Sequence, residues 1–286
     1  MKWLLPFLVS VLALAVSSCS SSGTGSVSYA EAPKFLNVSS WDPKERQRTG
    51  QSYSPLNQTS LRQNGSRALI ARCAKGPEID QKCGDFLVGA ERSGQLLGAY
   101  YYLVPWEPAE KQAERFVNRL KQIKRTRSLR TDRILLVGDI DTNCNSGQIV
   151  RFIKHMEALT GKTPVIYLEN SKGLQDRLRA APPAHKKVIR RAPYWIALYS
   201  NSNESLPHIK TPDDLTAAYG IWRRWTMWQY GGVFWENGRS DAKTYQTSSW
   251  RAPRYFGNID RPLERNSFNG SAAQFEQFWA NQSWRW

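Results

Sequence analysis

The feature that most constrains the fold is an alternation of short apolar segments with segments of helical periodicity, from residue 35 to about residue 190. The apolar segments are short and rich in β-branched and aromatic residues, as buried strands are. They are FLNV (35–38), ALIAR (68–72), LGAYYYL (97–103), ILLVGD (134–139) and PVIYL (164–168). Strands that alternate with helices form a parallel sheet, because each helix returns the chain to the start of the next strand. The sequence therefore predicts an α/β fold.

Apolar residues recur at helical spacing between these strands. Two long helices are predicted over residues 107–124 and 146–160, and Gly161 can cap the second. Shorter helices fit residues 84–93 and 172–180. Strand and helix thus alternate about five times.

The pattern changes after residue 190. Strand-like segments occur at YWIAL (194–198), WTMWQY (225–230) and YFGNID (255–260), with no clear helical segment between them. Eight strands in this order favour a single-domain barrel in which the last three strands lack helical cover. An open doubly wound sheet is the alternative, but no Gly-rich phosphate-binding sequence follows any strand.

The amino-terminal residues have the layout of an export signal. An apolar stretch from Trp3 to Val16 follows Lys2 and is too short to span a membrane as a helix. Small residues then lead to Cys19, and the segment VSSC (16–19) resembles a bacterial lipobox. That resemblance implies cleavage before Cys19 and a lipid anchor on its thiol, whereas secretion without an anchor is the alternative.

These features divide the chain into three parts. We expect a lipoprotein signal peptide over residues 1–18, a lipidated Cys19 with a flexible tether over residues 19–33, and one domain over residues 34–286. The protein would then be a monomer anchored in the cell envelope on the periplasmic side. Ser20 after the cysteine resembles the sorting signal for the outer membrane.

The chain is strongly basic, with a formal net charge of +16 and a pI near 9.9. Such a charge favours binding to an acidic partner or surface. For an exported, membrane-tethered chain we expect the anionic polymers of the envelope rather than nucleic acid. The local runs KQIKRTRSLR (121–130) and HKKVIRR (185–191) are typical of a solvated basic surface.

Cysteines are few. Cys73 and Cys83 lie ten residues apart around a Gly-Pro turn, and an exported chain can link them by a disulfide. Cys144 is then unpaired, and we expect it to be buried. Because Cys144 lies three residues after Asp141, a place in the wall of a site is the alternative.

Two acids end the fourth predicted strand, in the segment ILLVGDIDTN (134–143). Alternate residues of a strand share a face, so Asp139 and Asp141 would have Cα atoms roughly 6.5 Å apart on one face. Two carboxylates that close repel each other, which tends to raise the pKa of one of them. The arrangement favours a functional site, and the alternative is that Asp141 only begins a turn.

In such a barrel the active site lies at the carboxyl ends of the strands. The polar residues at these ends are Asn37, Arg72, Tyr100 to Tyr102, Asp139, Asp141, Tyr167, Glu169, Tyr199, Gln229, Tyr230 and Asp260. Aromatic rings with polar edges suit the CH-rich faces of sugars, although most of the twelve Trp and twelve Tyr residues must fill the core.

Other chemistries lack candidate residues. The three histidines, His155, His185 and His208, have no metal-binding spacing, so we expect no metal and no cofactor. No G-x-S-x-G segment supplies a serine nucleophile. Paired carboxylates remain, and glycoside hydrolysis is the reaction that most commonly needs only those.

The order of the motifs resembles a known family. Between about residues 34 and 279 the chain carries FLNVSSW, ALIAR, GAYYY, GDID, TGKTPVIY, YWIALY, WTMWQYGG and LERNSFNGS. This order resembles glycoside hydrolase family 25, the Chalaropsis-type lysozymes, which cleave peptidoglycan after N-acetylmuramic acid. The resemblance implies a flattened, TIM-like (β/α)5(β)3 barrel and muramidase activity.

The resemblance also implies roles for individual residues. Asp141 stands where the family has a Glu that acts as general acid, and Asp139 would hold charge beside it or orient the acetamido group of the substrate. An aspartate is about 1.5 Å shorter than a glutamate, which affects transfer of the proton. Asn37 and Glu264 replace two family aspartates, and Asn37 can only form hydrogen bonds. The further residues that we expect to bind substrate are Arg72, Tyr100, Tyr102, Tyr167, Trp195, Tyr199 and Gln229.

Two functions follow from these residues. The first is an active muramidase with peptidoglycan strands as its partner, tethered to the membrane through lipidated Cys19. The second is a lipoprotein that binds peptidoglycan or another glycan without cutting it, because Asn37, Asp141 and Glu264 all depart from the family pattern. A glycosidase for another polymer is a third possibility, since a fold does not fix a substrate.

Overall fold

The computed structural model describes residues 28–42, 56–199, 211–236, 239–245, 250–251 and 263–286. The signal peptide, Cys19 and most of the tether lie outside these residues. None of the helices within the described ranges is long and apolar enough to cross a membrane.

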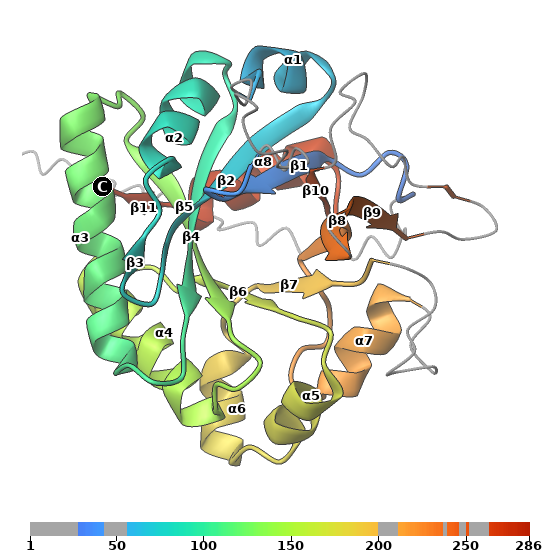
Figure 1. The fold of residues 1–286 in the computed structure, drawn as a ribbon. Helices are drawn as coiled ribbons and strands as arrows, with labels where there is room; N and C mark the ends of the chain where they lie inside the picture. The colour runs from blue at the N-terminus through green and yellow to red at the C-terminus, as the bar shows by residue number, and fades with distance from the viewer. Residues whose placement is uncertain (1–27, 43–55, 200–210, 237–238, 246–249, 252–262) are drawn as a thin grey trace, which may run out of the picture.

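Eight strands close into a barrel, as the sequence predicts (Figure 1). In chain order they are β1 (Lys34–Val38), β2 (Ser66–Lys75), β4 (Leu96–Leu103), β5 (Arg133–Ile140), β6 (Val165–Leu168), β7 (Tyr194–Ala197), β8 (Met227–Glu236) and β10 (Glu264–Phe268). The first seven run parallel, and β10 closes the barrel between β8 and β1 with antiparallel pairing on both sides. The segment 255–260, predicted as the last strand, lies outside the described residues.

The four predicted helices are present as α2 (Cys83–Arg92), α3 (Ala109–Arg127), α4 (Ser146–Thr160) and α5 (Lys172–Arg179). Gly161 ends α4 in the left-handed conformation, with φ of 68°, as the sequence predicts. Figure 1 shows these helices around the outside of the barrel.

The prediction that no helix separates the strands after residue 190 is wrong. Helix α7 (Pro212–Tyr219) lies between β7 and β8. It has strong end signals, a capping box between Thr211 and Asp214 and a C-terminal Gly220, but only two turns in which to show an apolar period. The other helices not predicted are α1 (Gln58–Gln63), α6 (Pro183–Ile189) and α8 (Ala272–Gln282).

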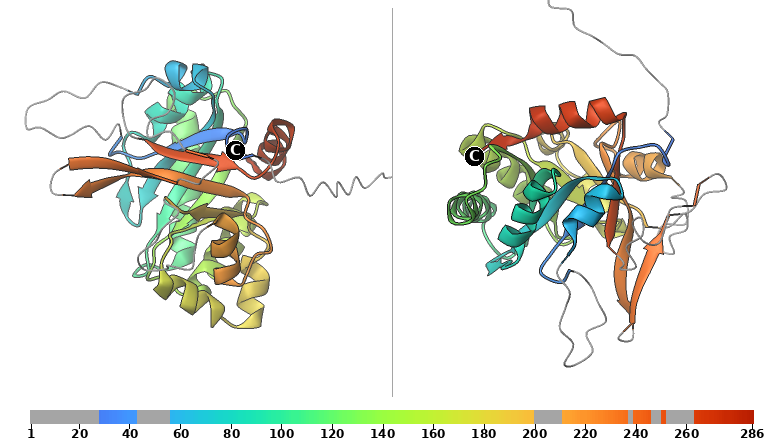
Figure 2. Two further views of the ribbon diagram at one scale, coloured as in Figure 1. Left: turned by 90° about the vertical axis from the view of Figure 1, so that its right-hand side faces the viewer. Right: turned by 90° about the horizontal axis from the view of Figure 1, so that it is seen from above.

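Three short strands extend the sheet. They are β3 (Glu78–Ile79), β9 (Arg239–Thr244) and β11 (Trp284–Arg285), which pair with β2, β8 and β5 respectively. Figure 2 shows β8 and β9 projecting from the barrel as a long hairpin. Because Trp284 pairs with Ile134 at the start of β5, the C-terminus is attached to the amino end of the barrel.

The barrel interior is packed at this amino end. Helix α8 lies across it, and its residues Phe275 and Trp279 join the inner cluster that contains Phe35, Leu135 and Trp195. The indole N–H of α8's Trp279 also donates to a backbone carbonyl of β4 at 2.8 Å. The interior is therefore filled from one side and can hold a ligand only at the carboxyl ends of the strands.

Candidate active site

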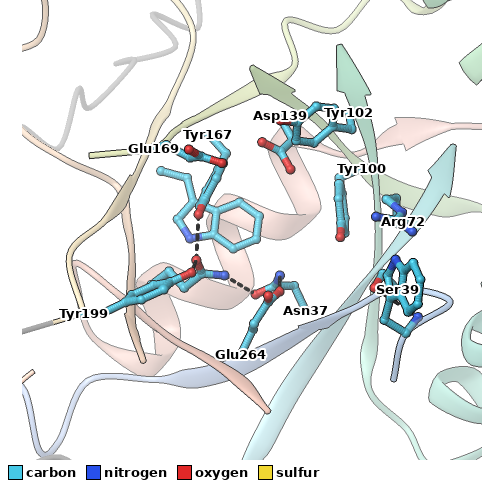
Figure 3. A pocket seen from close by; sticks show the side chains of 13 residues that line it. Asn37, Ser39, Arg72, Tyr100, Tyr102, Asp139, Tyr167, Glu169, Tyr199 and Glu264 are labelled. Atoms are coloured by element: carbon cyan, nitrogen blue, oxygen red, sulfur yellow. Dashed lines mark hydrogen bonds between the residues drawn. The ribbon is translucent and has the colours of Figure 1, made fainter. Parts of the chain in front are cut away.

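A cavity of about 200 Å³ opens at the carboxyl ends of the barrel strands. Its lining consists of Asn37, Ser39, Trp41, Arg72, Tyr100, Tyr102, Asp139, Tyr167, Glu169, Trp195, Tyr199, Gln229 and Glu264. Figure 3 shows side chains from opposite walls of the barrel pointing into this space. Among the residues predicted to act in catalysis or to bind substrate, only Asp141 is absent from the lining; of the other strand-end candidates, Tyr101 and Tyr230 are also absent and Asp260 lies outside the described residues.

A chain of hydrogen bonds connects the side chains on one wall of the cavity. Asn37 donates from Nδ2 to Glu264 and accepts at Oδ1 from Gln229 Nε2 at 2.8 Å. The hydroxyls of Tyr167 and Tyr199 both donate to Gln229 Oε1, the first at 2.7 Å. Each group is held by its neighbour, so this wall is preorganised before a ligand enters.

Asp139 is the most unusual group in the cavity. It lies near the end of β5, in register with Tyr102 on β4 and Tyr167 on β6. Its Oδ1 is buried and has no hydrogen-bond partner among the residues that the structure describes. Burial raises the pKa of Asp139 well above its ordinary value, and the carboxylates of Glu169 and Glu264 raise it further, while Arg72 partly offsets them.

Asp141 does not line this cavity, although it contacts Tyr102, which does. Strand β5 ends at Ile140, and Asp141 begins a turn in which its Oδ1 accepts from the backbone N–H of Asn143 at 2.8 Å. Its Oδ2 accepts from the hydroxyl of Tyr102 at 3.0 Å. Burial and nearby carboxylates raise the pKa of Tyr102, so the hydroxyl keeps its proton for this bond. The turn that the sequence offers as an alternative for Asp141 is present.

Glu169 is among the strand-end residues identified in the sequence, but the sequence assigned it no catalytic or binding role. It follows β6, two residues after Tyr167, and its side chain is in the cavity lining. Glu169 keeps an exposed surface, but desolvation of its carboxyl in the cavity raises its pKa, with further contributions from Asp141 and Glu264 and a partial offset from Lys75. Its position after a strand was visible in the sequence, but only the pairing of β5 with β6 brings it beside Asp139.

The fold and the carboxylates at the strand ends can be compared with known proteins. The family model of glycosyl hydrolases family 25 matches residues 38–238, more than half of the chain. The chain belongs to this family. Within the matched segment lie Asp139, Asp141 and Glu169, whereas Asn37 and Glu264 flank it on either side.

Solved structures resemble the whole family 25 barrel. The lysozyme from Streptomyces coelicolor is 20% identical with a TM-score of 0.56, and the match covers 88% of this chain and 98% of that one. The muramidase from Acremonium alcalophilum is 19% identical with a TM-score of 0.54, covering 87% and 98%. The spore cortex lytic enzyme SleM from Clostridium perfringens is 20% identical with a TM-score of 0.59, covering 87% and 70%. At this identity the similarity establishes the fold. No curated protein matches the sequence.

The three cysteines that the structure describes are absent from the cavity lining of this family 25 barrel. Cys73 Sγ and Cys83 Sγ are 3.1 Å apart, and both are buried free thiols in the structure. Cys144 is buried, as predicted, and its Sγ lies 3.5 Å from the carbonyl oxygen of Leu103. Because Cys144 is absent from the cavity lining, the alternative that it forms a wall of the site is not supported.

Proposed function

We propose that this family 25 protein is a peptidoglycan hydrolase, a lysozyme-like muramidase that cleaves the β-1,4 bond between N-acetylmuramic acid and N-acetylglucosamine. The observation that carries the proposal is Asp139, whose buried Oδ1 has no hydrogen-bond partner among the described residues and which lines an aromatic-walled cavity. Two of the proteins that share the fold are a lysozyme and a muramidase by name. Glycoside hydrolysis needs a pair of carboxyl groups, and this cavity supplies them without a cofactor.

Asp139 suits the acetamido group of the substrate. An unpartnered buried oxygen is costly, and an N–H donor from the sugar would satisfy it. The bond would hold the acetamido group in place while the adjacent anomeric carbon gains positive charge. Since the pKa of Asp139 is raised by neighbouring carboxylates, it ionises most readily when one of them holds a proton.

The other walls suit a glycan chain with carboxylate groups. Tyr100, Tyr199 and Trp195 present aromatic surface to the cavity, which favours the apolar faces of sugar rings. Arg72 lines the same space and is held by Asp80, with Nε 3.1 Å from its Oδ2. The net charge of +16 favours approach of the anionic wall polymer.

The location of the protein forms part of the same proposal. A signal peptide over residues 1–18 and lipidation of Cys19 would tether the domain, residues 34–286, to a membrane of the envelope through residues 19–33. The outer membrane is the expected site, and the protein is expected to be a monomer. The proposed location rests on the sequence of the amino-terminal segment.

A glycan-binding protein without activity is the second candidate, because Asp141 is shorter than the family's glutamate and is held outside the cavity lining. Incubation of full-length protein in detergent with insoluble peptidoglycan separates the two candidates. A muramidase releases soluble fragments, and Asp139→Asn reduces their release. A binding protein sediments with the peptidoglycan and releases nothing.

A further inference from the structure

We propose that Glu169, rather than Asp141, is the acid that protonates the leaving oxygen of the glycosidic bond. This assignment rests on the glycosidase activity proposed above. It also explains how a chain with a shortened residue at the expected acid position can keep a complete site.

The contacts of Asp141 leave it unsuited to this role. Both of its carboxylate oxygens already accept hydrogen bonds, from the Tyr102 hydroxyl at 3.0 Å and from the Asn143 N–H at 2.8 Å. Its own backbone is fixed as well, because its N–H donates to the Leu103 carbonyl at 3.1 Å. Neither oxygen is free to present a proton to a sugar in the cavity.

The pairing of β5 with β6 places Glu169 where it can replace Asp141. Asp139 pairs with Tyr167, and Ile140 pairs with Leu168 at the ends of the two strands. Asp141 and Glu169 are the residues that directly follow the two strands. Neighbouring strands are about 4.8 Å apart, so Glu169 lies one strand further along the barrel wall than Asp141.

The side chain of Glu169 has the properties that Asp141 lacks. It lines the cavity, and Figure 3 shows its carboxyl group turned toward the same space as that of Asp139. Within the described part of the chain its carboxyl accepts no hydrogen bond. Desolvation in the cavity and the neighbouring Asp141 and Glu264 raise the pKa of Glu169, and Lys75 only partly offsets them, which favours the protonated form that an acid needs.

Glu169 would donate a proton in the first step of the reaction and regain one in the second. As the bond between the anomeric carbon and the glycosidic oxygen breaks, its electron pair goes to that oxygen, which takes the proton of Glu169. A water molecule then adds to the anomeric carbon and returns one proton to the Glu169 carboxylate. Asp141 acts as a positioning residue, because its negative charge keeps the proton on Glu169.

A comparison of two leaving groups shows whether Glu169 donates a proton or has only a structural role. Peptidoglycan releases a sugar hydroxyl, which leaves poorly without a proton, whereas an aryl glycoside of the same sugar releases a phenolate, which needs none. Full-length Glu169→Gln should therefore lose roughly 10²- to 10⁴-fold in kcat on peptidoglycan and only a few-fold on the aryl glycoside. Glu276→Gln, an exposed substitution on α8, serves as the matched control.

The pH profile provides a second readout. In the wild type, activity on peptidoglycan should fall as pH rises through the raised pKa of Glu169. Asp141→Asn removes a charge that raises this pKa, so the falling limb should move to lower pH with less than about tenfold loss of maximal kcat. In the Glu169→Gln variant, the residual activity on peptidoglycan should no longer fall over this pH range.

Two results would overturn the assignment. One is Glu169→Gln with wild-type activity on peptidoglycan while Asp141→Asn is inactive. The other is an equal loss on both substrates by Glu169→Gln, which would indicate a structural role. A wild-type protein that cleaves neither substrate would instead refute the proposed function, so the two failures are distinguishable.

Discussion

The side-chain amide of Asn37 donates to the carboxylate of Glu264, across the seam where the first and last strands of the barrel meet. The sequence resemblance implies aspartates at these two positions, which lie outside the segment that the family model matches. An aspartate at position 37 could not donate this bond and would repel Glu264. Asn37 and Glu264 thus form a neutral–charged hydrogen-bonded pair, whereas two acids at these positions would be like charges.

Restoring the aspartate should weaken the fold. Asn37→Asp opposes two carboxylates at register partners, which should cost about 1–3 kcal/mol at pH 7 and lower Tm by several degrees. The loss should shrink at pH 4, where a carboxyl is more easily protonated. Thermal unfolding at both pH values measures it.

The double variant Asn37→Asp/Glu264→Gln is the matched control, because the Gln amide can donate to the new carboxylate and most of the Tm should return. A single variant with the Tm of the wild type at pH 7 would show that the Asn37–Glu264 contact does not stabilise the barrel.

Asp139 should limit stability at neutral pH. A carboxyl whose pKa is raised by folding binds more protons in the folded chain than in the unfolded chain, so stability falls as pH rises from the unfolded value, about 3.9, through the raised one. Asp139→Asn should therefore raise Tm by roughly 2–4 °C or more at pH 7 and by less at pH 4. Asp132→Asn, at an exposed aspartate, should change Tm little at either pH. A lower Tm for Asp139→Asn at pH 7 would contradict this account of the buried charge.

Trp41 should bind the glycan at the mouth of the cavity. It lines the cavity, yet 60% of its surface is exposed, which is typical of a ring that stacks on a ligand. Trp41→Ala should raise KM on peptidoglycan roughly three- to tenfold and leave kcat nearly unchanged, as the loss of about 1 kcal/mol implies. Trp106 is 67% exposed but absent from the lining, so Trp106→Ala should leave KM unchanged. Equal KM values for the wild type and Trp41→Ala would exclude the role.

Cys73 and Cys83 should form a disulfide in the exported protein. Their Sγ atoms are 3.1 Å apart and a bond of about 2.05 Å needs only a small shift. Denatured, unreduced protein with lipidated Cys19 should then contain one reactive thiol, from Cys144, and three after reduction. Mass spectrometry after alkylation counts them, and three alkylated cysteines without reductant would show that the pair stays reduced.

The sequence predicts the barrel well because its strands are buried runs with flanking helices long enough to show a period. The prediction from sequence is wrong where an element is too short to show a periodic pattern. Helix α7 is indicated in the sequence only by the residues at its two ends. The segment 255–260 was predicted to be the last strand, whereas the strand that closes the barrel is Glu264–Phe268.

The site is predicted less completely, for a geometric reason. Strand periodicity places Asp139 and Asp141 on one face, but β5 ends at Ile140, and Asp141 binds the Asn143 N–H in the following turn and does not line the cavity. The importance of Glu169 depends on the register of β5 with β6, which a single sequence does not contain. The positions at the ends of strands therefore identify the candidate site residues, while the pairing of the strands determines which of these residues lie close together.

The central claim is that this cavity cuts peptidoglycan after N-acetylmuramic acid. The most direct measurement is mass spectrometry of the soluble products when full-length protein is incubated with purified peptidoglycan, alongside Glu169→Gln and Asp139→Asn. The account predicts muropeptides with a reducing N-acetylmuramic acid end from the wild type and almost none from either variant. Products with a reducing N-acetylglucosamine end, or no products from a wild-type protein that still sediments with peptidoglycan, would contradict it.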